Sequence, residues 1–307
     1  MPRAADDTGP RPGDPRVTTG YARPDTIGAA IELLAQDGAA PMGGGTDLAG
    51  QIDRGLREPS LLVDLQALPL DSIDEDEGEV HVGATVTLAQ LARSPEIAPY
   101  AAVVTAAEEA ASPLLRNAGT VGGNLCQHTR CWYYRGVEWH CWLGGGDTCY
   151  AQIGDHRKHN LEPGDCISAH PSDLAPALAA CDATVVVIGP QGERELPLLD
   201  LYRRPTSDNR SLLTLGHGEL VSAVRLPPPP DASVYLRAGE RQAFSFPLVS
   251  VAAARRGDQV RLVATGIANI PRELDPKDPL ADLPGNPQTH WKRQLLATLV
   301  ERAAASL

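Results

Sequence analysis

Half of the cysteines in this chain lie in one short aromatic stretch, where thiolate chemistry is to be expected. Residues 130–150, RCWYYRGVEWHCWLGGGDTCY, hold three of the six cysteines, three of the four tryptophans and three of the seven tyrosines. Thiolates bind zinc ions and iron–sulfur clusters, and reactive cysteines need the same ionised form. No apolar period of 3.6 or 2 residues organises the stretch, so it predicts neither a helix nor a strand.

Two glycine clusters form a second candidate site. They are PMGGGTDLAG at 41–50 and RNAGTVGGNL at 116–125. Consecutive glycines permit positive φ and let backbone N–H groups converge on an anion. Side chains that can hold a ribose or ribityl chain lie in both clusters: Thr46, Asp47, Thr120 and Asn124. Neither cluster is a dinucleotide fingerprint or a phosphate loop, and either one alone is also typical of a tight turn that caps a helix.

Charge and composition restrict the class of protein and its compartment. The formal net charge is -12, which argues against a general nucleic-acid binder because phosphate neutralisation needs clustered Lys and Arg. No apolar run is long enough to span a membrane, and the first residues lack the apolar core of a secretory signal. We therefore expect a disordered tail at 1–16 and a cytoplasmic location, where thiols stay reduced and structural disulfides are rare.

The surrounding elements must hold these motifs in place. The predicted helices are 24–38 with Asp25 as its cap, 87–94, 100–112, 172–182 and the C-terminal stretch from His290. The predicted strands are 61–65 and 79–85, separated by an acidic loop, and two hairpins that turn at 189–192 and 256–259. Four consecutive prolines within 225–232 break the chain. We expect one mixed domain at 17–228 and a small α+β domain at 232–307.

The motifs GGGTDL, RNAGTVGGNL and SDLAPAL, in this order and at these separations, resemble the flavin subunit of the xanthine dehydrogenase family of molybdenum hydroxylases. The resemblance implies an α+β fold: a two-part FAD-binding domain of the PCMH type, followed by a C-terminal α+β domain like that of the CO dehydrogenase flavoprotein. It also implies two partners, a large subunit with the molybdenum cofactor and a small subunit with 2Fe–2S clusters.

The family's motifs assign the FAD contacts by position. The first glycine loop would enclose the pyrophosphate, and the second would form another wall of the same site. Arg237 stands where the family often has a lysine near the flavin, and an arginine keeps that positive charge. The implied FAD-binding residues are Met42, Gly43, Gly44, Gly45, Thr46, Asp47, Leu48, Asn117, Thr120, Gly122, Gly123, Asn124, Ser172, Asp173 and Arg237.

The cysteine-rich stretch is similar to an insertion that only a subset of the family carries. This subset, which includes 4-hydroxybenzoyl-CoA reductase and bacterial aldehyde oxidoreductases, holds a 4Fe–4S cluster there. The implied insertion spans 126–168, and the implied cluster ligands are Cys131, Cys141, Cys149 and Cys166. The two remaining cysteines are expected near the flavin motif, for Cys126, and inside an apolar helix, for Cys181.

Other interpretations of the cysteines stay open. Four cysteines can bind zinc, although the C-x-x-C pairs typical of structural zinc sites are absent. The thiols can also be unligated. Five histidines share the region, namely His128, His140, His156, His159 and His170; one of them can replace a cysteine ligand, but we expect most to be solvated. The aromatic residues are expected to bury the cluster.

The resemblance favours an electron-transfer flavoprotein with FAD and a 4Fe–4S cluster, in which the cofactors do the chemistry and the chain positions them. The added cluster would serve a one-electron partner such as ferredoxin. Two other classes of function remain: a self-sufficient FAD oxidase or dehydrogenase of the vanillyl-alcohol-oxidase type, and a zinc-stabilised scaffold that has lost its flavin.

Overall fold

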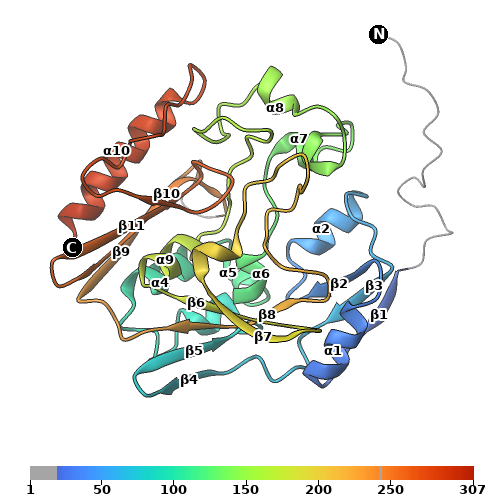
Figure 1. Ribbon diagram of the computed structural model, residues 1–307. Helices are drawn as coiled ribbons and strands as arrows, with labels where there is room; N and C mark the ends of the chain where they lie inside the picture. The colour runs from blue at the N-terminus through green and yellow to red at the C-terminus, as the bar shows by residue number, and fades with distance from the viewer. Residues whose placement is uncertain (1–18, 242–243) are drawn as a thin grey trace, which may run out of the picture.

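The computed structural model describes residues 19–241 and 244–307, and the tail predicted at 1–16 lies outside them. The described residues form three β-sheets with helices packed between and around them (Figure 1). This mixture of sheets and helices confirms the predicted fold class. No helix in the described ranges has both the length and the apolar character needed to cross a bilayer.

A small parallel sheet carries the first glycine loop. Its strands are β1 (Gly20–Ala22), β2 (Ala39–Met42) and β3 (Leu61–Asp64), in the order β1-β3-β2. Helix α1 (Ile27–Leu34) connects β1 to β2, and Thr26, rather than the predicted Asp25, accepts the capping hydrogen bond from the Ala29 amide. Strand β2 ends where the glycine loop begins, and helix α2 (Leu48–Asp53) follows that loop.

The second sheet is antiparallel and has five strands in the order β4-β5-β8-β6-β7. Its strands are β4 (Ile73–Asp76), β5 (Glu79–Gly83), β6 (Thr184–Gly189), β7 (Gly192–Pro197) and β8 (Leu220–Leu226). The prediction of a loop between the strands at 61–65 and 79–85 was wrong, because β4 lies there. Its acidic side chains remain exposed on the sheet edge, and Glu77 and Gly78 turn the chain with positive φ values of 50° and 85°.

Helices cover this sheet and bring the second glycine loop to it. They are α3 (Leu88–Leu91), α4 (Ala101–Glu109), α5 (Pro113–Arg116), α6 (Val121–Leu125), α9 (Leu174–Ala180) and the 3₁₀ turn η2 (Leu198–Leu201). Every residue of α9 is buried, which agrees with the apolar helix predicted there. Cys181 at its end is fully buried as expected.

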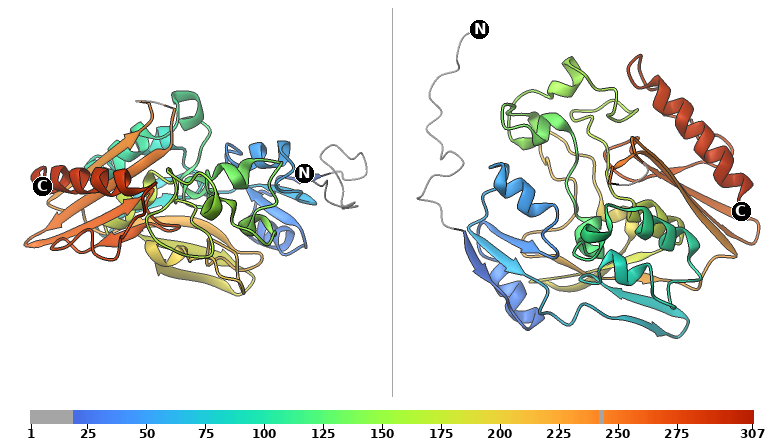
Figure 2. Two further views of the ribbon diagram at one scale, coloured as in Figure 1. Left: turned by 90° about the horizontal axis from the view of Figure 1, so that it is seen from above. Right: turned by 180° about the vertical axis from the view of Figure 1, so that it is seen from behind.

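A third, antiparallel sheet lies at the opposite end of the molecule from the first (Figure 2). Its elements are β9 (Ala232–Gly239), β10 (Pro247–Arg256), β11 (Gln259–Thr265), β12 (Arg272–Leu274) and the helix α10 (His290–Ala305). Strand β10 alternates between two cores: Val251 and Ala253 face α10, whereas Ala252 and Ala254 join the central core. This alternation fixes the sheet between α9 and α10.

The cysteine-rich segment 126–168, here called the cysteine loop, forms an edge of the molecule opposite β4 and lies between α2 and α10 (Figure 1). It contains only short helical turns, namely α7 (Trp132–Arg135), η1 (Trp142–Gly144) and α8 (Tyr150–Ile153). Its small apolar cluster is built around Tyr133, Tyr134, Cys141, Ala151 and Ile167. Such a small cluster cannot replace a regular core, so other contacts must hold the loop.

One of those contacts is a fully buried lysine of α10. Lys292 is 0% exposed and donates to the backbone oxygens of Lys158 at 3.1 Å and His159 at 2.7 Å, and also to the carbonyl of Gly266. Burial lowers the pKa of Lys292 to about 7, whereas three carbonyl acceptors favour its protonated form. The ammonium thus joins α10, the cysteine loop and the end of β11.

Replacing this lysine should destabilise the protein. Lys292→Met leaves three buried carbonyls without a donor, and we expect the free energy of unfolding to fall by about 3 kcal/mol in urea titrations. Arg302→Met, which changes an exposed cation of the same helix, is the matched control and should shift it by less than about 0.5 kcal/mol. Equal effects of the two substitutions would show that Lys292 does not hold the loop.

Candidate functional site

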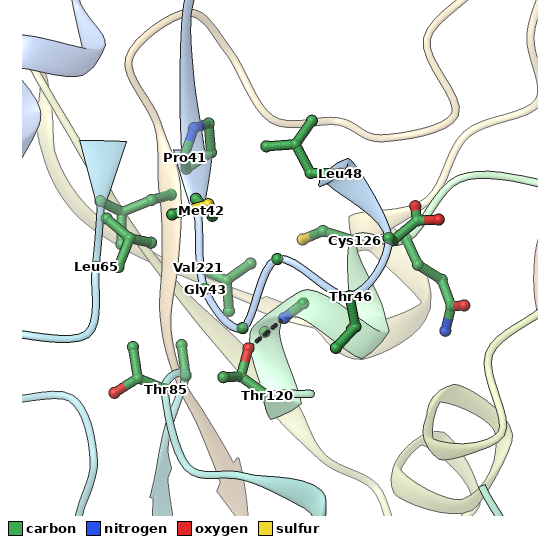
Figure 3. Close-up of a pocket in the computed structure, with 18 of the residues that line it drawn as sticks. Pro41, Met42, Gly43, Thr46, Leu48, Leu65, Thr85, Thr120, Cys126 and Val221 are labelled. Atoms are coloured by element: carbon green, nitrogen blue, oxygen red, sulfur yellow. Dashed lines mark hydrogen bonds between the residues drawn. The ribbon is translucent and has the colours of Figure 1, made fainter. Parts of the chain in front are cut away.

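The two predicted glycine loops meet. A Cβ atom on Gly44 would overlap the carbonyl oxygen of Ala118, and one on Gly43 would lie 2.6 Å from Oγ1 of Thr120. Figure 3 shows Thr120 beside the loop at Gly43, and its Oγ1 accepts a hydrogen bond of 3.1 Å from the Gly123 amide. Only glycine permits this approach, so the residue types of the first loop follow from its packing against the second.

A cavity of about 280 Å³ opens between these loops and β8. Within the described part of the chain, the amide N–H groups of residues 43–47 donate to no hydrogen-bond acceptor. Buried or half-buried N–H groups need a partner, and several that converge form a site for an anion. The apolar side of the cavity is formed by Leu65, Leu213, Leu215 and Val221. The cavity therefore offers donors at one side and an apolar wall at the other.

A smaller hollow of about 80 Å³ also borders the two glycine loops. Asn124, Asp173 and Phe246 line it. Ser172 holds the Asn124 side chain by donating to its Oδ1 at 2.6 Å, and Tyr235 donates to Oδ1 of Asp173 at 2.6 Å. Burial raises the pKa of Asp173 to about 6, although the nearby Arg237 guanidinium opposes that shift.

Most of the residues predicted to bind a flavin line these two spaces. Those in the 280 Å³ cavity are Met42, Gly43, Gly44, Gly45, Thr46, Asp47, Leu48, Thr120, Gly122 and Gly123. Asn124 and Asp173 line the hollow, and Ser172 and Arg237 contact these two residues. Asn117 is exposed at the end of α5 and outside both spaces, so its role stays a prediction.

Sequence reasoning did not identify the apolar wall. Leu213 and Leu215 belong to an irregular segment before β8, and Val221 belongs to β8 itself. Apolar residues in a loop carry no motif, and no periodic pattern assigns them to a cavity. Cys126, which was predicted near the flavin motif, does line this cavity.

Asp47 connects the first glycine loop to the cysteine loop. Its carboxylate forms ion pairs with Arg130 and with Arg135, the second at 2.8 Å, and it accepts a hydrogen bond of 3.0 Å from the His128 amide. Burial would raise the pKa of Asp47, but the two guanidinium groups and the His128 amide outweigh it and hold that pKa below its usual range. The guanidinium of Arg130 also lies 4.2 Å from the centre of the Phe246 ring.

The four cysteines predicted as cluster ligands line a single small cavity. They are Cys131, Cys141, Cys149 and Cys166, and all four are free thiols. Aromatic side chains enclose them, as predicted: Tyr133, Tyr134, Trp142 and Tyr150 complete much of the wall. Within the described ranges, no group of three or more His, Cys, Asp or Glu side chains has the spacing to hold a metal ion.

Each short turn of the cysteine loop begins at one of these cysteines. Cys131 precedes α7, Cys141 precedes η1 and Cys149 precedes α8. Amides that follow each cysteine approach its sulfur and lower its pKa, for example those of Tyr133 and Tyr134 at Cys131 and those of Leu143 and Gly144 at Cys141. Burial is the larger effect at these two sites and raises their pKa, at Cys131 to about 11.

The side chains of Cys149 and Cys166 interact within this cavity. Their mutual hydrogen bond lowers the pKa of Cys149 and raises that of Cys166. Backbone N–H groups are thus directed at the sulfurs within the cavity. Such N–H···S contacts are typical of thiolates that ligate a metal or cluster.

The prediction that most of the five histidines are solvated was wrong. His159 and His170 are only 2% and 5% exposed, and His128 and His156 are half-buried, which leaves His140 exposed. His170 packs edge-on against Tyr202, and Nε2 of His159 lies 3.1 Å from Sγ of Cys131. Contacts with residues far along the chain bury these rings, which local polarity did not reveal.

Comparison with known proteins places this geometry in a family. Residues 16–229 match the family model of the FAD binding domain in molybdopterin dehydrogenase. The chain is 35% identical over 258 residues to the aldehyde oxidoreductase FAD-binding subunit PaoB of Escherichia coli K12. This match covers 81% of each protein. It is 28% identical over 220 residues to the carbon monoxide dehydrogenase medium chain of Afipia carboxidovorans, over 70% of this chain and 60% of that one.

The fold is shared with solved structures. A reconstituted CO dehydrogenase from Oligotropha carboxidovorans matches with a TM-score of 0.70 and 21% identity, over 94% of this chain and 97% of that chain. At this identity the likeness establishes the fold alone.

The contact between the two glycine loops gives a test. Gly44→Ala forces the loops apart, so we expect FAD to bind at least about tenfold more weakly, as measured by fluorescence titration of the apoprotein. Gly50→Ala, in α2 where a Cβ meets nothing within 4 Å, is the control and should keep the affinity. Unchanged binding by the Gly44 variant would mean that the cavity does not need this approach.

The ion pairs of Asp47, which join the first glycine loop to the cysteine loop, can also be tested. Asp47→Asn leaves Arg130 and Arg135 without their counter-ion, and we expect about 2 kcal/mol less stability together with faster proteolysis in the cysteine loop. Asp53→Asn changes an exposed carboxylate of α2 and serves as the control. Identical stability and cleavage rates for wild type and Asp47→Asn would refute the tether.

Proposed function

Because the chain belongs to the family of FAD-binding domains of molybdopterin dehydrogenases, we propose that it carries FAD and a 4Fe–4S cluster and transfers electrons between partner subunits and an external acceptor or donor. Family membership makes the chain an FAD-binding, oxidoreductase subunit of a molybdenum hydroxylase-type dehydrogenase. The cluster, the partners and the electron-transfer role are the proposal.

The residues of the glycine-loop cavity fit FAD. Its open amides at 43–47 would bind the pyrophosphate, and the wall at Leu213, Leu215 and Val221 would take an apolar ring of the cofactor. The hollow beside Asn124 and Asp173 provides the polar groups for the rest of the molecule. Bound FAD would supply the ability to accept electrons in pairs and release them singly.

The main support for a 4Fe–4S cluster is that four cysteines line one cavity. They come from positions as far apart as Cys131 and Cys166, yet all four line the same space, and amides approach their sulfurs. A 4Fe–4S cluster needs four thiolates, and because it is larger than one ion its ligands lie farther apart than those of zinc. The aromatic wall would keep water away from it.

The partners follow from the family. We propose a large subunit with the molybdenum cofactor, a small subunit with 2Fe–2S clusters, and a one-electron carrier such as ferredoxin as the exchange partner of the 4Fe–4S cluster. The PaoB protein, 35% identical to this chain, is named as the FAD-binding subunit of an aldehyde oxidoreductase, which supports an assembly of several chains. We further propose that residues 17–228 form the FAD-binding domain and 232–307 the C-terminal domain.

Cofactor content tests the proposal directly. The chain purified without oxygen should contain one FAD, about four irons and about four acid-labile sulfides. Cys141→Ser and Cys149→Ser should lose most of the iron and keep FAD, whereas Cys181→Ala, in the fully buried position after α9, should keep both. FAD without iron would show that the chain is a simple flavin subunit. Zinc in the cysteine cavity would favour the zinc-stabilised scaffold. Turnover by the isolated chain would favour a self-sufficient oxidase.

A further inference from the structure

One buried histidine contacts the cysteine cavity from outside. His159 is 2% exposed, and its Nε2 atom lies 3.1 Å from Sγ of Cys131. The ring is not part of the cavity wall, which the four cysteines and their aromatic neighbours complete. It therefore stands behind one sulfur rather than among the groups that face the centre.

Neighbouring groups fix the position of this ring. Trp132 packs edge-on against it with ring centres 4.7 Å apart, and the His159 amide donates to the His156 carbonyl at 2.9 Å. The His159 carbonyl in turn accepts a hydrogen bond of 2.7 Å from Lys292. Trp132 of the cysteine loop thus holds the His159 ring, and Lys292 of α10 holds the His159 backbone.

The contacts also determine which ring nitrogen carries the proton. Nδ1 of His159 is buried and has no hydrogen-bond partner among the described residues. A buried N–H without an acceptor costs more than an unpaired ring lone pair, so the proton belongs on Nε2. A ligating thiolate can only accept, and it therefore requires the same tautomer.

We propose that His159 donates its Nε2 proton to the Cys131 thiolate and so raises the reduction potential of the 4Fe–4S cluster, an inference that rests on the proposed function. Reduction adds negative charge to the cluster and its sulfur ligands. A hydrogen bond to a ligand sulfur stabilises this more negative state, and fewer such bonds make the potential lower. His159 is a positioning and tuning residue and ligates no iron.

Substitutions at 159 separate the hydrogen bond from the packing. His159→Phe keeps an aromatic ring against Trp132 but removes the donor, and His159→Gln restores a side-chain N–H. His140→Phe, on the same loop at an exposed position beside Cys141, is the matched control. The readouts are iron and sulfide per chain and the midpoint potential of the cluster from a redox titration followed by electron paramagnetic resonance.

We expect His159→Phe to keep its iron and to titrate at a lower potential than wild type. His159→Gln should return towards the wild-type value, and His140→Phe should match it. A full cluster with an unchanged potential in His159→Phe would overturn the inference while leaving the proposed function intact. A wild-type chain without iron would overturn the proposed function instead.

A measurement on the unaltered protein covers the case in which His159→Phe loses its cluster. Pulsed electron paramagnetic resonance of the reduced wild type, with histidine labelled by nitrogen-15, should show a weakly coupled exchangeable proton and a weak nitrogen coupling. A strong nitrogen coupling that is absent from His159→Gln would identify His159 as an iron ligand and refute its role as a donor.

Discussion

The carboxylate of Asp47 is the interaction on which both candidate sites depend. Asp47 lies in the first glycine loop, directly before α2, and its carboxylate accepts a hydrogen bond from the His128 amide while pairing with Arg130 and Arg135. Arg130 is the neighbour of Cys131 in sequence, so its ion pair with Asp47 links the glycine-loop cavity to the cysteine cavity. The Arg135 guanidinium extends this connection, because it also donates to the carbonyl of Thr129 at 2.9 Å.

The cysteine loop is held by polar contacts at its borders because its own apolar cluster is small. Arg210 donates to the carbonyls of Trp142 at 2.6 Å and Gly146 at 2.8 Å, and its guanidinium lies 4.7 Å from the Trp142 ring centre. Lys292 binds the loop from α10, and Asp47 binds it from α2. Three charged side chains from three separate parts of the chain thus replace the regular core that short helical turns cannot build.

Local patterns were sufficient for several of the helices and strands. The helix at α9, both hairpins and the two glycine loops follow from periodicity and turn residues, and the four cysteines were identified by number and resemblance. Strand β4 was missed because its acidic edge has the composition of a loop. The burial of His159 and Lys292 could not be predicted from the sequence either. Their burial depends on partners far away in the chain, such as Cys131 and Gly266, and a single sequence does not contain those distances.

The charges at Asp47 explain how an acidic chain can present a cavity suited to an anion. The formal net charge of the protein is -12, and a lone carboxylate in the first glycine loop would repel a pyrophosphate. The two guanidinium groups outweigh this one carboxylate, so the net charge of the three groups is positive. Both arginines belong to the cysteine loop, so that loop supplies the positive charge beside the open amides of 43–47. A change that removes Arg130 and Arg135 from Asp47 should therefore weaken anion binding at these amides, and by linkage an anion bound there should stabilise these contacts of the cysteine loop.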